Sequence, residues 1–443
     1  MSASDSIYAL SSGSGRAGVA VMRVSGPGSR VALERLCGFV PRERFMSLVE
    51  LSDAHQGFLD RGLAVFFPGP RSFTGEDCAE LHVHGGRAVI AAIEAALGAI
   101  EGLRPAEAGE FAQRAFNNGK LDLTAAEGLV DLIEAETEAQ RRAVARLSVG
   151  EGDRLLEELG RRLMAIRTEV EARIDFSDEG DVYDSGSERL RRALDSLLGT
   201  VRGLIDTGLR GRKVRDGLVV AIAGAPNVGK SSLLNWLAGR DAAIVSDEPG
   251  TTRDIIEIVL DLGGVSVRVF DTAGLRDAVG VEAEGVRRAR ALFAQCDLVI
   301  GLVDAGGSAA VDILLDKSGD NLPQPEFWTY RSRVDLMDAN ATVSDGLSTT
   351  TGHGLDSLLE RLTRFAEGFA DLGPVSFSRD RQLQELRLVA SSMNDAMSRL
   401  VDESFDLAAE DLRRAGDALG RLTGRVHAED VLGSIFSSFC IGK

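Results

Sequence analysis

Clustered cysteines, long apolar runs and an excess of basic residues are all lacking in this sequence of 443 residues. Its four cysteines (Cys37, Cys78, Cys296 and Cys440) have no C-x-x-C spacing, which argues against a disulfide framework and a zinc cluster. No apolar stretch approaches the roughly 18 residues that span a bilayer. The N-terminus "MSASDSIYAL" lacks the basic region and apolar core of a secretory signal. We therefore expect a cytoplasmic protein that does not enter the membrane.

Basic charge is scarce throughout, because 50 Lys and Arg stand against 68 Asp and Glu, for a net charge of −18. No segment of the chain has a basic excess. A broad surface that neutralises nucleic-acid phosphates is therefore excluded. If the protein works on RNA, a local patch or a partner must supply most of the binding.

The order of apolar patterns predicts a multidomain protein. Short strands and glycine turns, such as "AGVAVMRVSG" and "CAELHVHGG", predict an α+β domain over residues 1–119. Long amphipathic helices fill 120–214 and return over 372–443. Between them, β-branched strands alternate with helices over 215–371, which indicates a doubly wound α/β domain. The economical interpretation is a discontinuous all-α domain into which the α/β domain is inserted.

A phosphate-binding loop follows the apolar strand "DGLVVAIAG" and opens a helix. The pattern is Gly224-x-x-x-x-Gly229-Lys230-Ser231, with Asn227, Val228 and Ser232 as further loop residues in contact with the nucleotide. Glycines let backbone N–H groups surround the phosphates. Lys230 can reach the β- and γ-phosphates as a catalytic cation, and the Ser231 hydroxyl can bind Mg²⁺.

Two motifs downstream complete a nucleotide switch. In "DEPGTTRD", Thr251 and Thr252 can sense the γ-phosphate, and Thr252 can ligate Mg²⁺. The hairpin that turns at Gly263-Gly264 delivers "DTAG" (Asp271, Thr272, Ala273 and Gly274), where Asp271 can hold Mg²⁺ through water. These motifs, in this order, resemble those of the translation-factor-like GTPases.

Base recognition departs from the N-K-x-D element of those GTPases. Here "SRVD" supplies Asp335 as the carboxylate for the guanine N1 and N2 donors, and Arg333 can cover the base as Lys would. Ser332 is too short to brace the loop as Asn does. Ser348, Thr349 and Thr350 fit the following S-A-K loop loosely.

The residue that would orient the attacking water also differs from that of many signalling GTPases, because Leu275 follows D-T-A-G where they have Gln. Glu282, in the same stretch, is the nearest carboxylate that could orient the attacking water. A solvated surface glutamate is the alternative interpretation.

From end to end, the sequence resembles the MnmE (TrmE) family of tRNA-modification GTPases. The stretches that carry this resemblance are "GRAGVAVMRVSG", "SFTGEDCAELHVHGG", "RPAEAGEFAQRAFNNGKLDLTAAEGLVDLI", the GTPase motifs and "IFSSFCIGK". The resemblance implies an N-terminal folate-binding domain that dimerises, a helical domain and an inserted G domain. It also implies work with the flavoprotein MnmG, which would supply FAD and NADH. The product would be a carboxymethylaminomethyl or aminomethyl group on carbon 5 of the tRNA wobble uridine, made from a 5-formyl or methylene tetrahydrofolate.

The resemblance also assigns roles to single residues. Arg23, Glu80 and Lys120 match folate-contacting positions, and a surface charge is the alternative for each. Potassium-dependent closure of the G domains is implied by a K⁺ shell of four residues: Asn227, Ser246, Glu248 and Thr251. Glu282 matches the glutamate that orients the water.

The C-terminal segment "IFSSFCIGK" ends in Lys443, which disfavours a prenylation box. The resemblance makes this segment functional, with Cys440 a candidate catalytic residue and Lys443 near the folate. A buried structural thiol would look the same in the sequence, so both interpretations of Cys440 stay open.

Two other functions remain as alternatives. One is a regulatory GTPase for ribosome assembly, which predicts a basic appendage. The other is a folate-binding one-carbon module with a structural G domain, for which the "SRVD" departure leaves room.

Overall fold

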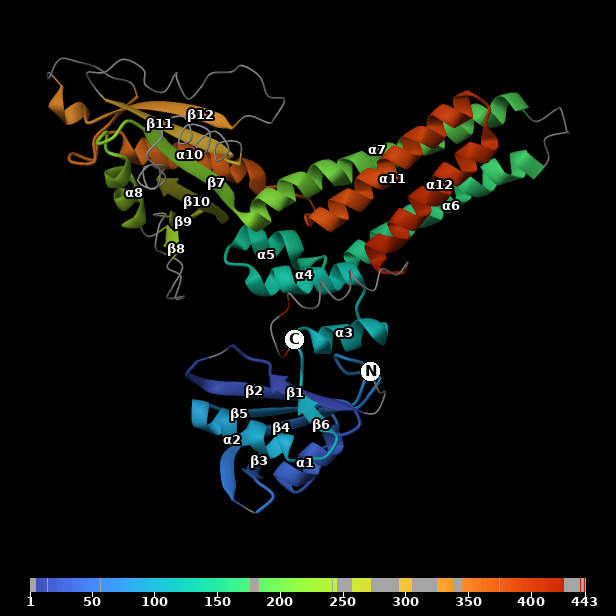
Figure 1. The fold of residues 1–443 in the computed structure, drawn as a ribbon, viewed down its shortest axis with the longest axis vertical. Coiled ribbons are helices and arrows are strands. Elements are labelled where there is room, and N and C mark those ends of the chain that lie inside the picture. Colours follow the sequence, from blue (N-terminus) through green and yellow to red (C-terminus); the bar gives the residue numbers. More distant parts are fainter. Residues whose placement is uncertain are drawn as a thin grey trace, which may run out of the picture. The chain divides into compact units, whose positions relative to one another are not determined.

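The computed structural model of the chain describes residues 5–13, 15–55, 57–175, 183–240, 242–244, 257–271, 295–304, 325–337, 345–373, 375–425, 439 and 442. It divides into two compact units (Figure 1). Unit 1 comprises Met1–Val130, Leu147–Leu197 and Leu388–Lys443, and unit 2 comprises Asp131–Arg146 and Leu198–Arg387. The domain boundaries predicted near residues 119, 214 and 371 stay a prediction.

Unit 1 begins with a six-stranded sheet in the order β3-β4-β5-β2-β1-β6. The strands are β1 (Ser6–Leu10), β2 (Ala17–Ser25), β3 (Ser47–Ser52), β4 (Phe58–Phe67), β5 (Cys78–Gly85) and β6 (Leu103–Pro105). The neighbours are antiparallel except for the parallel pair β1 and β6.

Alternation along these strands gives the sheet two different faces. On one face, Met22, Val24 and Leu81 are buried in an apolar core with residues of α1 (Ser29–Cys37) and α2 (Arg87–Gly98). The other face carries Arg23 and Glu80, which are paired across β2 and β5. On that face α3 (Glu110–Asn117) packs against β1 through a smaller cluster. The polar face is therefore only partly covered by apolar side chains.

Two helices that are far apart in the sequence lie side by side in unit 1 (Figure 1). They are α6 (Glu151–Asp175) and α12 (Phe405–Thr423). Buried leucines recur at helical spacing on α6, and α12 faces them with alanines and leucines. Two further long helices, α7 (Tyr183–Asp216) and α11 (Asp380–Val401), have residues in both units. The helical part is therefore built from segments before and after the second sheet, as the sequence predicts.

Unit 2 contains a seven-stranded sheet in the order β13-β12-β11-β7-β10-β9-β8. The strands are β7 (Leu218–Gly224), β8 (Ala243–Ile244), β9 (Glu257–Leu262), β10 (Val265–Asp271), β11 (Leu298–Asp304), β12 (Glu326–Ser332) and β13 (Gly346–Leu347). Those from β10 across to β13 are parallel, and β9 returns antiparallel from the predicted turn at Gly263-Gly264. Helices α8 (Lys230–Ala238) and α10 (Leu355–Ala370) contribute to its apolar core.

A short helix that precedes this sheet in the sequence is hydrogen-bonded to the β9–β10 turn. The helix is α5 (Glu138–Ala145), which follows α4 (Leu123–Glu134) and begins with a capping box between Thr137 and Gln140. The Ala139 N–H donates to the Gly264 carbonyl at 2.9 Å. Among the described residues, no helix is both long and apolar enough to cross a membrane.

Candidate functional site

The loop between β7 and α8 has the backbone of a phosphate-binding site. Gly224 has φ 154°, and a Cβ there would lie 2.5 Å from the Leu302 carbonyl oxygen. Gly229, just before α8, has φ 103°. Both are backbone conformations that favour glycine, which explains the spacing of the motif. The loop therefore presents the N-terminus of α8 to an anion.

Lys230 and Ser231 are the first two residues of α8, and their side chains contact the loop and the end of β10. The Lys230 side chain is buried, and its Nζ donates to the Gly224 and Ala225 carbonyls at 3.2 and 2.9 Å. The Ser231 hydroxyl donates to Asp271 Oδ2 at 2.8 Å. Mg²⁺ prefers such oxygens, which would hold it directly at Ser231 and through water at Asp271. This donor pair fits the predicted magnesium site.

The predicted nucleotide-binding residues of the loop and of the first turn of α8 differ in their exposure to solvent. Val228 is buried in the unit 2 core, whereas Asn227, Ser231 and Ser232 are exposed. Asn227 has φ 62°, a conformation that asparagine tolerates better than most residues. Its amide is thus accessible to a ligand at the phosphate site, as the predicted potassium shell requires.

The "SRVD" element follows β12, the strand next to β11. Ser332 is buried, and its hydroxyl donates to the Val303 carbonyl on β11 at 3.3 Å. Arg333 turns the chain with φ 59°. The Ser348 hydroxyl donates to Asp335 Oδ1 at 2.6 Å. Ser348 therefore braces the carboxylate that would read guanine, a link between the two loops that the sequence analysis missed, while Ser332 holds only the end of β12 to β11.

Ten predicted site residues lie outside the described residues. They are Ser246, Glu248, Thr251, Thr252, Thr272, Ala273, Gly274, Glu282, Cys440 and Lys443.

Arg23 and Glu80 form an ion pair on the polar face of the N-terminal sheet. Arg23 Nε donates to Glu80 Oε1 at 3.0 Å, and its second nitrogen lies 2.9 Å from the same oxygen. The guanidinium also lies over the rings of Phe73 and Phe111, with centroids at 5.1 and 5.8 Å. Lys120 is exposed and lies over the Gly75 turn of the loop that carries Phe73. The structure thus joins two of the predicted folate residues directly and places the third beside the same loop.

A network of charged side chains fixes α3, and with it Phe111, against this face. Glu110 is 1% exposed and accepts hydrogen bonds from Arg104 and Arg114 at 2.6 to 3.3 Å. Burial raises the pKa of the Glu110 carboxyl, but hydrogen bonds from Arg104, the Glu107 N–H and Arg114 outweigh it and lower the pKa to about 2. Arg114 also contacts Glu76, which accepts from Ser25 at 2.7 Å. The sequence analysis missed this network, although its members fall in the stretches "SFTGED" and "RPAEAGEFAQR".

The described residues of the C-terminal segment lie in unit 1. Phe439 is 5% exposed and packs with Leu123, Ala126 and Val130 of α4 and with α3. The carbonyl of Gly442 accepts from the Ser11 hydroxyl at 2.8 Å, at the end of β1. On β1, Ala9 is paired with Arg23. The segment therefore approaches the strand pair that carries Arg23.

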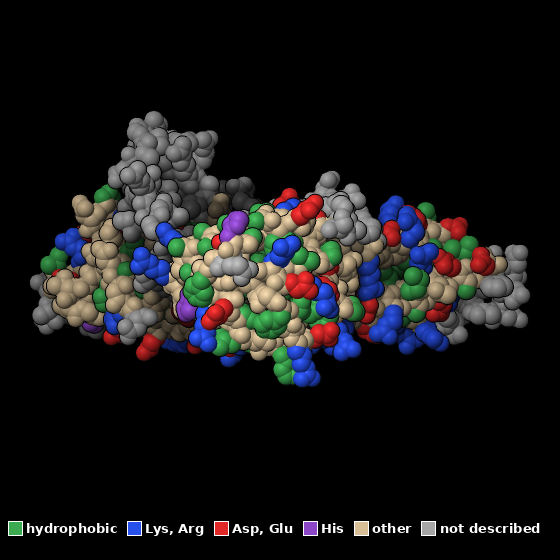
Figure 2. Space-filling model, turned by 90° about the horizontal axis from the view of Figure 1, so that it is seen from below, with side chains coloured by type: hydrophobic (Ala, Val, Ile, Leu, Met, Phe, Trp, Pro, Cys, Tyr) green, Lys and Arg blue, Asp and Glu red, His purple; other side chains and the backbone are tan. Residues whose placement is uncertain are grey.

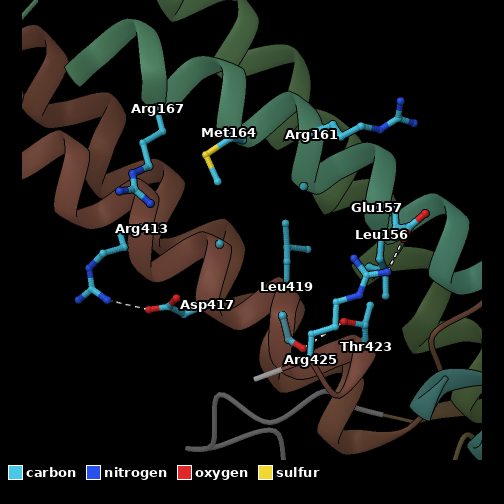
Figure 3. A pocket seen from close by; sticks show the side chains of 13 residues that line it. Leu156, Glu157, Arg161, Met164, Arg167, Arg413, Asp417, Leu419, Thr423 and Arg425 are labelled. Carbon is cyan, nitrogen blue, oxygen red and sulfur yellow. Dashed lines mark hydrogen bonds and ion pairs between the residues drawn. The ribbon is translucent and has the colours of Figure 1, made fainter. Parts of the chain in front are cut away.

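A pocket of about 570 Å³ lies between α6 and α12 (Figure 3). Its lining includes Arg161, Arg413 and Arg425 and the exposed Met164. The arginines are paired with acids, for example Arg413 with Asp417 at 2.9 Å. Figure 2 likewise shows basic and acidic side chains interspersed on the face drawn. This pocket has little free positive charge to offer an anion.

Comparison with known proteins identifies the family. The "MnmE helical domain" model matches residues 123–440, and the "GTP-binding protein TrmE N-terminus" model matches residues 6–120. The tRNA modification GTPases MnmE of Brucella melitensis and Brucella anthropi are each 46% identical to this chain, over 444 and 447 residues. These alignments cover 99% of this chain and 98% of each relative.

The chain belongs to the MnmE family. Membership of the MnmE family confirms the predicted fold class and the prediction of a GTPase. Among solved structures, the G domain of the T. maritima FeoB iron transporter is similar to 34% of this chain and 98% of its own length. That similarity has 26% identity and a TM-score of 0.25, too low to add to the assignment.

Proposed function

We propose that this MnmE-family chain is the GTP-hydrolysing half of an enzyme that modifies carbon 5 of the tRNA wobble uridine. Its partner is the flavoprotein MnmG, which brings FAD and NADH. A tetrahydrofolate derivative bound at Arg23, Glu80 and Lys120 provides the one-carbon unit. The chain works as a homodimer in the cytoplasm, and potassium promotes closure of its G domains.

The observation that supports this proposal best is that two separate clusters of polar side chains, one in each unit, occur in one chain of the family. In unit 2, Lys230, Ser231 and Asp271 converge at the start of α8. In unit 1, Arg23 forms an ion pair with Glu80, and its guanidinium lies over the rings of Phe73 and Phe111. A switch for ribosome assembly has no use for the second site, and a structural G domain has no use for the first.

For GTP hydrolysis, the chain's own residues bind and orient the nucleotide. The N-terminal N–H groups of α8 and Lys230 hold the phosphates, which withdraws charge from the leaving group. Asp335 accepts hydrogen bonds from the guanine N1 and N2 donors while Ser348 holds its other side. Mg²⁺ and K⁺, when bound, neutralise charge that develops on the phosphates. Glu282 orients the attacking water in this proposal.

In the N-terminal domain, Glu80 accepts from the amino groups of the pterin ring and the cations face the acidic portion of the folate. The rings of Phe73 and of the buried Phe111 hold the Arg23 guanidinium in place. The Glu110 network keeps Phe111 in place. Binding at this site positions the carrier of the one-carbon unit.

GTP turnover measured in KCl and in NaCl tests the potassium step. We expect turnover of the wild-type chain to be at least tenfold faster in KCl. The Asn227→Ala variant should lose this difference, whereas Ser357→Ala, at an exposed residue of α10, should retain it. Equal rates of the wild-type chain in both salts would refute potassium activation.

Analysis of tRNA from a strain that lacks the gene tests the modification role. We expect unmodified wobble uridines, restored by the wild-type gene and not by the Lys230→Ala variant. Unaltered wobble uridines would defeat the proposed role in modification. Modification restored by Lys230→Ala would instead support the one-carbon module with a structural G domain.

A further inference from the structure

His82 on β5 has a buried ring nitrogen that the folate-contacting residues named so far leave unexplained. Its Nε2 is buried, and among the described residues it has no hydrogen-bond partner. His82 is paired across the sheet with Val21 on β2 and with Leu63 on β4, so its side chain is on the same face as theirs. A buried polar atom without a partner destabilises the fold, so a ligand that completes it would bind more tightly.

Glu80 lies two residues before His82 on the same strand and so faces the same side of the sheet. Arg23 occupies only Glu80 Oε1. The second oxygen, Oε2, lies 3.5 Å from His82 Nε2, beyond the roughly 2.7–3.2 Å of a good hydrogen bond. The Glu80 carboxylate therefore offers an acceptor, and the His82 side chain, which is 22% exposed, can turn its buried nitrogen toward a ligand on the same polar face.

A cyclic amide presents the hydrogen-bonding groups that complement this acceptor and this nitrogen. One edge of an oxo-pterin carries a 2-amino donor, a ring N–H donor and then the carbonyl at carbon 4. A carboxylate can accept from the ring N–H while a neighbouring N–H donates to that carbonyl. The negative charge of Glu80 favours the His82 tautomer with its proton on Nε2, which is the donor that the carbonyl needs.

We propose that His82 is a specificity-determining residue that donates from Nε2 to the carbonyl at carbon 4 of the bound pterin. This inference rests on the proposed folate site and adds a residue to it. Glu80, which accepts from the 2-amino group, also accepts from the ring N–H beside that carbonyl through Oε2. Val21 and Leu63 flank His82 on the neighbouring strands. Together Glu80 and His82 distinguish a 4-oxo pterin from a 4-amino pterin.

Folic acid and aminopterin differ in this ring by the 4-oxo and 4-amino groups, so they are the probes. Their dissociation constants are measured by equilibrium dialysis with the full-length chain and three variants. His82→Leu should weaken folic acid binding about tenfold and change aminopterin binding by less than about twofold. His82→Gln, which keeps an N–H donor, should restore much of the preference for the oxo compound.

His84→Gln is the matched control on the same strand. His84 is exposed and its Nδ1 lies 2.8 Å from Asp60, so its ring has a partner of its own. This variant should keep the wild-type ratio of the two affinities. Thermal unfolding of each variant establishes that the chain remains folded.

The outcomes separate this inference from the proposal on which it rests. If His82→Leu changes the two affinities by the same factor, or changes neither, the specificity role is overturned while the folate site stands. A histidine that only positions Glu80 would change the two affinities by the same factor. If the wild-type chain binds neither compound, the role of His82 falls, and the same dialysis with 5-formyl tetrahydrofolate decides whether the folate site falls with it.

Discussion

Replacing Glu110 with Gln tests whether the buried charge network stabilises the face that carries Arg23. Glu110 is 1% exposed and is held by two arginines. The substitution keeps the size of the side chain but removes its charge, and it turns one acceptor into a donor aimed at the guanidinium groups. Because the two arginines, of which Arg114 is largely buried, would keep only the partly exposed Asp5 and Glu76 as counter-charges, α3 should loosen.

The magnitude follows from the pKa of Glu110, which is lowered from its ordinary value of 4.5 to about 2. One pKa unit corresponds to about 1.36 kcal/mol, so the charged form is stabilised by about 3 kcal/mol in the native state. A depressed pKa means that the unfolded state binds more protons between pH 2 and 4.5. This stabilisation is therefore complete above about pH 5.5 and is lost as the pH falls from 4.5 toward 2.

The assay is native-state hydrogen exchange of the backbone amides of α3, read by mass spectrometry in the full-length chain. Opening of α3 should become easier by about 3 kcal/mol in Glu110→Gln at pH 7, and the difference from the wild type should shrink as the pH is lowered. GTP turnover should be unaffected at pH 7, because the nucleotide site is in unit 2.

Glu138 provides a matched control. Hydrogen bonds from Arg141 and Arg142 lower its pKa to about 2 as well, but its side chain is 46% exposed. Exposed ion pairs contribute little, so Glu138→Gln should leave the exchange of α3 and α5 nearly unchanged. If Glu110→Gln exchanges like the wild type, or if both variants lose the same protection, the argument from burial is wrong.

Two further predictions concern the base-reading loop and the C-terminal segment. Asp335→Asn should weaken GTP binding at least about 100-fold, because charged hydrogen bonds to guanine are lost, and should favour xanthosine triphosphate, whose ring oxygen accepts from the amide. Competition between the two nucleotides measures this, and unchanged preference for GTP would exclude Asp335 as the base reader. Phe439→Ala should remove about 3–5 kcal/mol of packing against α4 and release the segment, which faster exchange of its amides would reveal. Undiminished protection there would show that the Ser11–Gly442 hydrogen bond suffices.

The sequence alone determined the parts of this protein that depend on local patterns. Gly224, Gly229, Lys230 and Ser231 have a fixed spacing because the loop needs glycine conformations beside a helix start. The turn at Gly263-Gly264 was predicted correctly because both glycines adopt positive φ between two strands of alternating pattern. The fold class followed in the same way, from strands and helices whose periods differ.

Only the tertiary structure decided which distant residues meet. Ser348 braces Asp335, and Glu110 joins Arg104 and Arg114, through contacts that no periodicity encodes. His82 has the same strand pattern as any half-buried residue, and its unsatisfied nitrogen became visible only with its neighbours in place. Periodicity indicates which face of a helix or strand is buried. The residues that meet across a sheet or between loops depend instead on the tertiary arrangement of the chain. That is why the glycine positions of the loop and of the β9–β10 turn could be predicted from the sequence, and the surroundings of Glu80 could not.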